Sequence, residues 1–338
     1  MHLWYSLVDL LLPFGWLQHA FMKNALLGVL LVTPIFGLLG TMIVNNRMAF
    51  FSDSLGHSAL TGIAIGVILG IKNPIWSMLF FSVLITIAIL VVKEANTAST
   101  DTIIGVFSST AVALGIVILS RNGGFNKYSV YLIGDLLSIN PTDLLTLSLV
   151  VILVISLWII IFNRLLLASM NPSLARSRGI NVRLYEYLFT MMMAVIVTIS
   201  IQWVGILIIS SLLILPAAAS RNVAKNMRQY HVYSVLIALI SGVSGLILSY
   251  YWGTATGATI ILISSAFFTV TFIVKLRLSW RLLVPLASYT FSAHFDDLKV
   301  SAFRCPHKVK YRRIPLILQT ITIVSVSWRA NLRIEPYK

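Results

Sequence analysis

Cysteine, nucleotide-binding motifs and charge are scarce or missing in this sequence. Cys305 is the only cysteine, so neither an internal disulfide nor a cluster of cysteine thiolates around a metal can form. No glycine is followed by lysine, which excludes the phosphate-binding loop G-x-x-x-x-G-K-[ST], and neither H-E-x-x-H nor C-x-x-C occurs. The sequence therefore has no recognisable motif of a nucleotide hydrolase or a metalloenzyme. If ATP drives its function, another chain must hydrolyse that ATP.

Charged residues make up only 10% of the chain, whereas a soluble domain would carry about 25%. A transmembrane helix needs about 20 consecutive apolar residues. Runs without Asp, Glu, Lys or Arg recur along the sequence, at 24–46, 54–71, 73–92, 102–120, 144–163, 187–220 and 229–274. Such uninterrupted runs exclude a transmembrane β-barrel, in which polar residues alternate with apolar ones. The pattern predicts an all-α, polytopic transmembrane helical bundle.

The two longest runs must each be divided, because a helix over 187–220 would be roughly 51 Å long, against a hydrocarbon core of about 30 Å. Polar residues and glycine interrupt the first run at 202–205, and aromatic residues and glycine interrupt the second at 250–253. The predicted spans are 24–46, 54–71, 73–92, 102–120, 144–163, 187–201, 204–220, 231–249 and 256–274. These are nine spans, or eight if 187–220 contains a re-entrant piece. Residues 3–22 are predicted to form an interfacial helix.

Basic residues in the loops set the predicted orientation and a predicted boundary. The loops 164–183 and 221–228 are rich in Lys and Arg, which favours the cytoplasm and places the N-terminus outside. Residues 277–338 hold 11 Lys and Arg against 3 Asp and Glu, a net +8 out of +15 for the whole chain. We therefore predict a transmembrane permease domain over 1–276 and a basic C-terminal extension over 277–338. That extension either lies on anionic lipid or has no function of its own, and we expect no nucleic-acid partner.

Asp53 and His57 stand out because they lie four residues apart within an apolar stretch, and so share one face of a helix with Thr61. Ser58, Gly62, Gly66 and Gly70 follow a neighbouring face, where small residues let another helix approach closely. A carboxylate in a bilayer is costly and needs a partner. Carboxylate and imidazole are typical ligands of divalent first-row metals, and both must be deprotonated to bind. Spacing alone leaves three interpretations open: a metal path, a structural hydrogen-bonded pair, or a proton relay.

The segment "NNRMAFFSDSLGHSALTGIAIG" resembles a motif of the membrane permeases of bacterial zinc, manganese and iron ATP-binding-cassette importers. The motif is R-x-M-x-x-x-G-D-x-x-x-H-x-x-L-x-G, which Arg47, Met48, Asp53, His57, Leu60 and Gly62 match. Ser52 replaces the usual glycine. Further segments that resemble the family follow in order at 130–139, 171–182, 204–221 and 253–268. The resemblance covers roughly residues 20–276.

The resemblance implies a homodimeric permease with a translocation path at the dimer axis and a fold similar to the vitamin B12 and siderophore importers. It implies that Asp53 and His57 are ligands of the transported metal ion and that no cofactor is bound stably. The transported ion would be zinc or manganese, with iron as the third choice. An ATP-binding-cassette ATPase subunit would dock on the loop 164–183, through Ala175, Arg178 and Gly179. An extracytoplasmic metal-binding protein would deliver the ion at the bacterial inner membrane.

The chain by itself is thus predicted not to be an enzyme. Three other functions remain open from the sequence: a proton-coupled secondary metal transporter that uses the same Asp–His pair, a siderophore- or cobalamin-type ABC permease, and a membrane scaffold without transport. A large organic ligand gives no reason for a paired Asp and His in the path. The loop "NPSLARSRG" is predicted to form a short helix that begins at Asn171-Pro172 and stops at Gly179.

Overall fold

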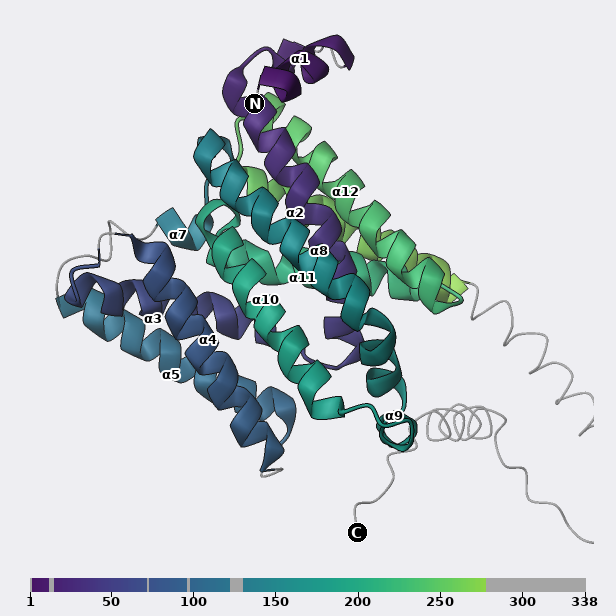
Figure 1. Cartoon of the computed structure of the whole chain (residues 1–338). Coiled ribbons are helices and arrows are strands. Elements are labelled where there is room, and N and C mark those ends of the chain that lie inside the picture. The colour runs from purple at the N-terminus through teal and green to yellow at the C-terminus, as the bar shows by residue number, and fades with distance from the viewer. Residues whose placement is uncertain (1, 12–14, 72, 96–97, 122–129, 278–338) are drawn as a thin grey trace, which may run out of the picture. The chain divides into compact units, whose positions relative to one another are not determined.

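The computed structural model is a bundle of α-helices, and it describes residues 2–11, 15–71, 73–95, 98–121 and 130–277 (Figure 1). Strands are absent from these residues. The helices are α1 (His2–Leu11), α2 (Ala20–Asn45), α3 (Phe51–Ile68), α4 (Pro74–Glu94), α5 (Thr100–Arg121), α7 (Val130–Ile133), α8 (Pro141–Met170), α9 (Pro172–Ser177), α10 (Val182–Val204), α11 (Ile206–Val223), α12 (Met227–Trp252) and a last helix (Thr256–Arg277). Two short 3-10 helices, η1 (Gly15–Leu17) and η2 (Leu136–Ser138), complete them. Of the predicted extension 277–338, only Arg277 lies within the described residues.

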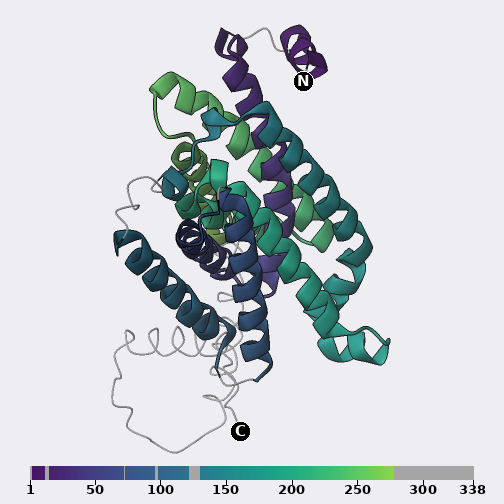
Figure 2. The same cartoon turned by 60° about the vertical axis from the view of Figure 1, so that its left-hand side comes forward.

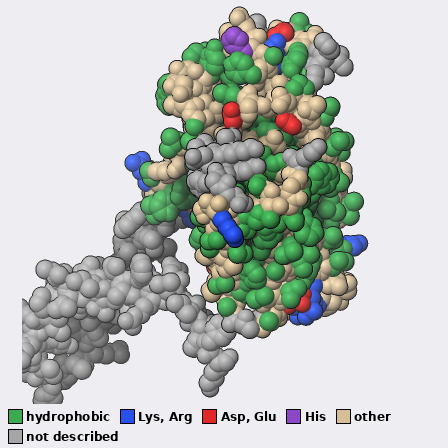
Figure 3. Space-filling model, turned by 90° about the vertical axis from the view of Figure 1, so that its left-hand side faces the viewer, with side chains coloured by type: hydrophobic (Ala, Val, Ile, Leu, Met, Phe, Trp, Pro, Cys, Tyr) green, Lys and Arg blue, Asp and Glu red, His purple; other side chains and the backbone are tan. Residues whose placement is uncertain are grey.

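The predicted all-α membrane bundle is confirmed, and each predicted span falls on one helix. Seven helices are long and apolar enough to cross a membrane, namely α2, α4, α5, α8, α10, α12 and the last helix. The predicted count of eight to nine spans lies slightly above this number of helices in the described residues. The two others are α3, which carries polar residues in its first turns, and α11; at 18 residues each they are about 27 Å long. Figure 3 shows a broad hydrophobic area on one face of the molecule, with few charged side chains among it.

Both predicted breaks in the long apolar runs are confirmed. Gly205 separates α10 from α11 with φ 88°, and Gly253 ends α12 with φ 63°. These values lie in the left-handed region, which glycine adopts without the steric cost of a Cβ atom. The predicted interfacial helix over 3–22 is divided, since α1 ends at Leu11 and η1 precedes the start of α2 at Ala20.

Residues predicted to lie on the same side of the membrane meet in the structure. Lys93 Nζ donates a hydrogen bond to Glu186 Oε1, which joins the end of α4 to the start of α10. On the opposite predicted side, Asn24 Nδ2 donates to the carbonyl oxygen of Ile139 over 3.2 Å. The helices therefore alternate in direction as the span order requires. Which end faces the cytoplasm stays a prediction.

Helix α3, which carries the Asp–His pair, lies between α4 and α5 (Figure 2). A Cβ atom on Gly62 would stand 2.7 Å from the carbonyl oxygen of Ser77, and one on Gly66 would stand 2.3 Å from the Ser77 hydroxyl. The prediction that small residues let another helix approach α3 is thus confirmed, and that helix is α4. Gly70 lies beyond the end of α3, with φ 69°, and does not join this contact.

Candidate metal path

The turn before α3 fixes how the Asp–His helix begins. Among the described residues other than glycine, only Arg47 has a positive φ, 55°, and it follows the end of α2. The next residue closes the turn, because Met48 N donates to the carbonyl oxygen of Ile43 over 3.0 Å. A left-handed conformation costs a residue with a Cβ roughly 1–2 kcal/mol. Ser52, which replaces the glycine of the related motif, is fully buried and donates to the Ala49 carbonyl oxygen. Ser52 therefore does not face the same space as Asp53.

Asp53 and His57 come together on α3, as their spacing predicts. His57 Nε2 lies 3.4 Å from Asp53 Oδ2, and the side chains are 23% and 41% exposed, respectively. In the first three turns of α3 only these two residues are partly exposed, and the others are buried. Asp53 is in the first turn of α3, where the positive end of the helix dipole favours a carboxylate. The two side chains therefore present an oxygen and a nitrogen ligand side by side.

The pair opens into a cavity of about 620 Å³ between α3 and α5. The opposite wall comes from α5 and includes Gly105, Ser108 and Ser109. Within the described residues, neither serine hydroxyl makes a hydrogen bond, whereas the exposed Thr110 on the same helix bonds back to the Val106 carbonyl oxygen over 2.8 Å. Unpaired hydroxyls are costly in hydrocarbon. The α5 wall therefore suits a hydrated passage, and the sequence analysis did not single it out.

Thr61, the third residue of the predicted polar face, has a different role. It is fully buried, and its hydroxyl donates to the carbonyl oxygen of Ala111 on α5. A Cβ atom on Gly115 would stand 2.9 Å from the Thr61 hydroxyl. One end of the polar face thus lines the cavity and the other holds α3 against α5.

Two ligands are too few for a resident metal. No group of three or more His, Cys, Asp and Glu side chains capable of holding a metal occurs among the described residues. Structural zinc sites have four protein ligands. The Asp53–His57 pair can therefore bind a metal firmly only when further ligands come from water or from another chain.

The predicted docking loop forms the short helix α9. Asn171 Oδ1 accepts from Leu174 N over 3.0 Å at its start, and Gly179 follows its end with φ 73°. Ile180 N donates to the carbonyl oxygen of Ala175 over 3.0 Å, which is the hydrogen bond of a glycine-terminated helix end. The predicted helix start and stop are confirmed. Ala175 is fully buried and therefore positions α9, whereas Arg178 is exposed.

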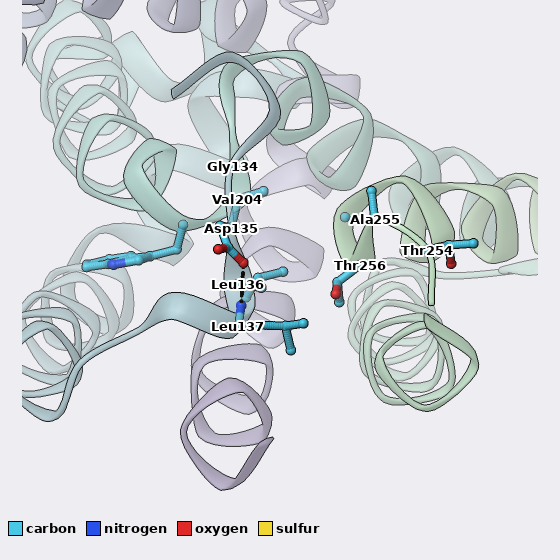
Figure 4. A pocket seen from close by; sticks show the side chains of 10 residues that line it. Gly134, Asp135, Leu136, Leu137, Val204, Thr254, Ala255 and Thr256 are labelled. Atoms are coloured by element: carbon cyan, nitrogen blue, oxygen red, sulfur yellow. Dashed lines mark hydrogen bonds between the residues drawn. The ribbon is translucent and has the colours of Figure 1, made fainter. Parts of the chain in front are cut away.

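Asp135 and His231 have structural partners. Asp135 Oδ1 accepts from Leu137 N over 3.0 Å and lies beside a small pocket of about 90 Å³ that also includes Thr256 (Figure 4). Such a volume holds only a few water molecules. His231 is buried, with Nδ1 2.7 Å from the hydroxyl oxygen of Thr41. Neither residue reaches the Asp53–His57 cavity, whose lining includes neither.

A helical bundle that crosses the membrane many times and sets a carboxylate and an imidazole beside an open cavity has the structure of a membrane permease. The model of the ABC 3 transport family matches residues 18–275, and the chain belongs to this family. The predicted resemblance to a permease, rather than to an ATPase subunit, is thereby confirmed.

Two relatives illustrate the family. The chain is 34% identical over 256 residues to the high-affinity zinc uptake system membrane protein ZnuB of Haemophilus influenzae, an alignment that covers 75% of this chain and 97% of that protein. It is 29% identical over 260 residues to the manganese import system permease protein ScaB of Streptococcus parasanguinis, with 77% and 92% covered.

A solved structure agrees with these matches. A chain of PsaBC from Streptococcus pneumoniae, solved in complex with Fab, superposes with a TM-score of 0.66 at 28% identity, covering 80% of this chain and 95% of that chain. The helical architecture is therefore that of an ABC importer permease.

Proposed function

We propose that this chain is the permease subunit of an ATP-driven importer of divalent metal ions in the bacterial inner membrane, with zinc or manganese as substrate and iron third. The observation that carries the proposal is the Asp53–His57 pair at an open cavity of a membrane permease. The relatives named for zinc and manganese uptake support the choice of metals.

The proposal places two copies of the chain around one path. Each copy contributes one Asp–His pair, so that two carboxylates and two imidazoles surround the ion. Four such ligands suit tetrahedral zinc, and additional water oxygens suit six-coordinate manganese. Because two protomers share the ligands, the ion can leave as they move apart.

The remaining partners follow from the same proposal. A separate ATP-binding-cassette subunit docks on α9 and the adjoining loop, where Arg178 is exposed and Gly179 fixes the turn. An extracytoplasmic metal-binding protein delivers the ion. The metal ion is the transported substrate in this proposal and is not a stably bound cofactor.

The test is ATP-driven uptake of zinc and of manganese by the full transporter in liposomes. Asp53→Asn keeps the shape of the side chain and removes its charge, while His57→Phe keeps an aromatic ring and removes the ligand nitrogens. Each variant should lower uptake by more than about tenfold, since even outer-shell changes at metal sites cost about 10–100-fold. Membrane insertion and binding of the ATPase subunit should remain normal.

Other functions predict other outcomes. A structural Asp–His pair predicts lost expression or assembly in the same variants. A proton-coupled transporter predicts metal uptake without ATP in vesicles that lack any ATPase subunit. Full uptake by a correctly assembled double variant would exclude the ligand role.

A further inference from the structure

A second open cavity, of about 630 Å³, lies where α8 ends and α10 begins. Its walls include Arg164 and Leu167 from α8, Arg178 after α9, and Leu184 and Tyr185 from α10, and none of its lining residues is acidic. In Figure 1, α9 and these helix ends lie on the side of the bundle away from α1. The cavity is separate from the Asp53–His57 path, with which it shares no lining residue.

Two arginines give this cavity an uncompensated positive charge. The Arg164 guanidinium donates to the Tyr185 hydroxyl and lies 5.7 Å from the centre of the Tyr185 ring, so its position is fixed. In the described part of the chain, neither Arg164 nor Arg178 pairs with a carboxylate, whereas Arg183 nearby lies 3.7 Å from Glu94. Guanidinium groups in such positions favour phosphate or carboxylate ligands.

The face of α8 above the cavity is apolar and exposed. Leu149, Ile152 and Ile160 are 70%, 61% and 72% exposed. Ile160 and Arg164 are four residues apart, so the exposed apolar face leads directly to the arginine. Arg164 lies roughly 35 Å along the helix from Pro141, just beyond the hydrocarbon core of about 30 Å. With Pro141 at one edge of the hydrocarbon core, Arg164 would therefore lie at the depth of the lipid phosphate groups on the other side.

We propose that this cavity binds an anionic phospholipid, with its phosphate between Arg164 and Arg178 and its acyl chains along the exposed face of α8. A free phosphate ion would satisfy the arginines but would leave the apolar walls and the adjoining face of α8 without a partner. Because Arg178 and Gly179 also belong to the docking loop, the bound lipid holds this loop at the membrane surface. The proposal depends on the membrane-spanning bundle and is independent of which metal is transported.

The experiment measures lipid retention by the full permease–ATPase complex. The complex is reconstituted in nanodiscs of phosphatidylcholine mixed equally with phosphatidylglycerol, and the lipids that stay bound after extraction are quantified by native mass spectrometry. The wild type should retain phosphatidylglycerol in preference to phosphatidylcholine. Arg164→Gln should lower that retention about fivefold, the contribution of one basic residue at an anionic membrane surface.

Two matched variants separate this site from general charge and from folding. Arg228→Gln removes the same charge from an exposed residue at the start of α12, outside the cavity and outside the docking loop, and should leave retention unchanged. Arg164→Lys keeps the charge and should keep most of the retention. Equal losses in Arg164→Gln and Arg228→Gln, or a loss in Arg164→Lys as large as in Arg164→Gln, would overturn the proposal.

Three further outcomes also decide the identity of the ligand. Displacement of the lipid by millimolar inorganic phosphate would assign the site to a free anion. Retention of phosphatidylglycerol only after removal of the ATPase subunit would assign the arginines to that partner. Equal retention of both lipids by the wild type would show that charge does not select the ligand. Each of these results contradicts the anionic-phospholipid site.

Discussion

Gly105 and Gly115 lie on the same helix, α5, and should respond in opposite ways to substitution. Gly105 lines the Asp53–His57 cavity, and a Cβ atom there would meet nothing within 4 Å. A Cβ atom on Gly115 would stand 2.9 Å from the Thr61 hydroxyl and 3.3 Å from the backbone of that residue. Gly105 therefore keeps the cavity open, while Gly115 lets α3 and α5 pack together.

The expected free energies follow from these contacts. Gly105→Ala should stabilise the protein by about 0.5–1 kcal/mol, because glycine in a helix costs that much relative to alanine. Gly115→Ala should destabilise it by about 1–3 kcal/mol, because the extra methyl group must move the backbone of α3. The two variants should thus differ by about 1.5–4 kcal/mol. A difference of 1 kcal/mol shifts the unfolding midpoint of a domain of 150–250 residues by about 2–4 °C, so the separation is measurable.

Substitutions of Gly105 should affect metal uptake differently from thermal stability. Gly105→Leu extends a branched side chain into the space opposite Asp53 and His57, so metal uptake in liposomes should fall sharply although the thermal midpoint stays at or above that of the wild type. Gly105→Ala is the control, and its uptake should remain close to the wild-type value. Uptake at the wild-type rate by a fully expressed Gly105→Leu protein would show that the α5 wall of this cavity does not border the path of the ion.

Two more predictions concern the α5 wall and α9. Ser108→Ala removes a hydroxyl that makes no hydrogen bond among the described residues, so the free energy of unfolding should change by less than about 0.5 kcal/mol. Manganese uptake should fall more than zinc uptake, because manganese prefers oxygen ligands. Equal losses of manganese and zinc uptake would contradict a role of this hydroxyl in coordination. Gly179→Val places a β-branched residue at φ 73° with no steric contact within 4 Å, so the strain of about 1–2 kcal/mol should act on the turn alone. Stimulation of the ATPase by metal-loaded binding protein should then drop while membrane insertion continues, and unchanged stimulation would remove α9 from the coupling mechanism.

The helices and their breaks were predictable because their signals are local. Apolar runs mark the spans, and the glycines at 205 and 253 supply the left-handed turns that end two helices. Local hydropathy does not show what surrounds a helix, however. Helix α3 is not among the seven most apolar long helices, because it carries polar residues in its first turns, yet it is buried almost throughout between neighbouring helices.

The two sides of the candidate site, on α3 and on α5, also differ in how far the sequence could predict them. Asp53 and His57 were predictable from the sequence because a spacing of four residues brings them together on any α-helix. Ser108 and Ser109 lie about fifty residues further along, inside an apolar run, and only the packing of α5 against α3 makes them the opposite wall. His231 shows the same limit, since its partner Thr41 lies on α2, far away in the sequence.

The small number of ligands that the described residues of one copy supply fits the proposed transport function. A site with four protein ligands on one chain would hold zinc firmly, as structural zinc sites do. A transported ion must also leave, and the Asp53–His57 pair, partly exposed at an open cavity, supplies only two ligands. In the proposed homodimer the second copy adds the other two, so the affinity for the ion depends on how closely the two α3 helices approach. In the same proposal, movement of ATPase subunits docked on α9 would change that separation and release the ion without any change within the pair itself.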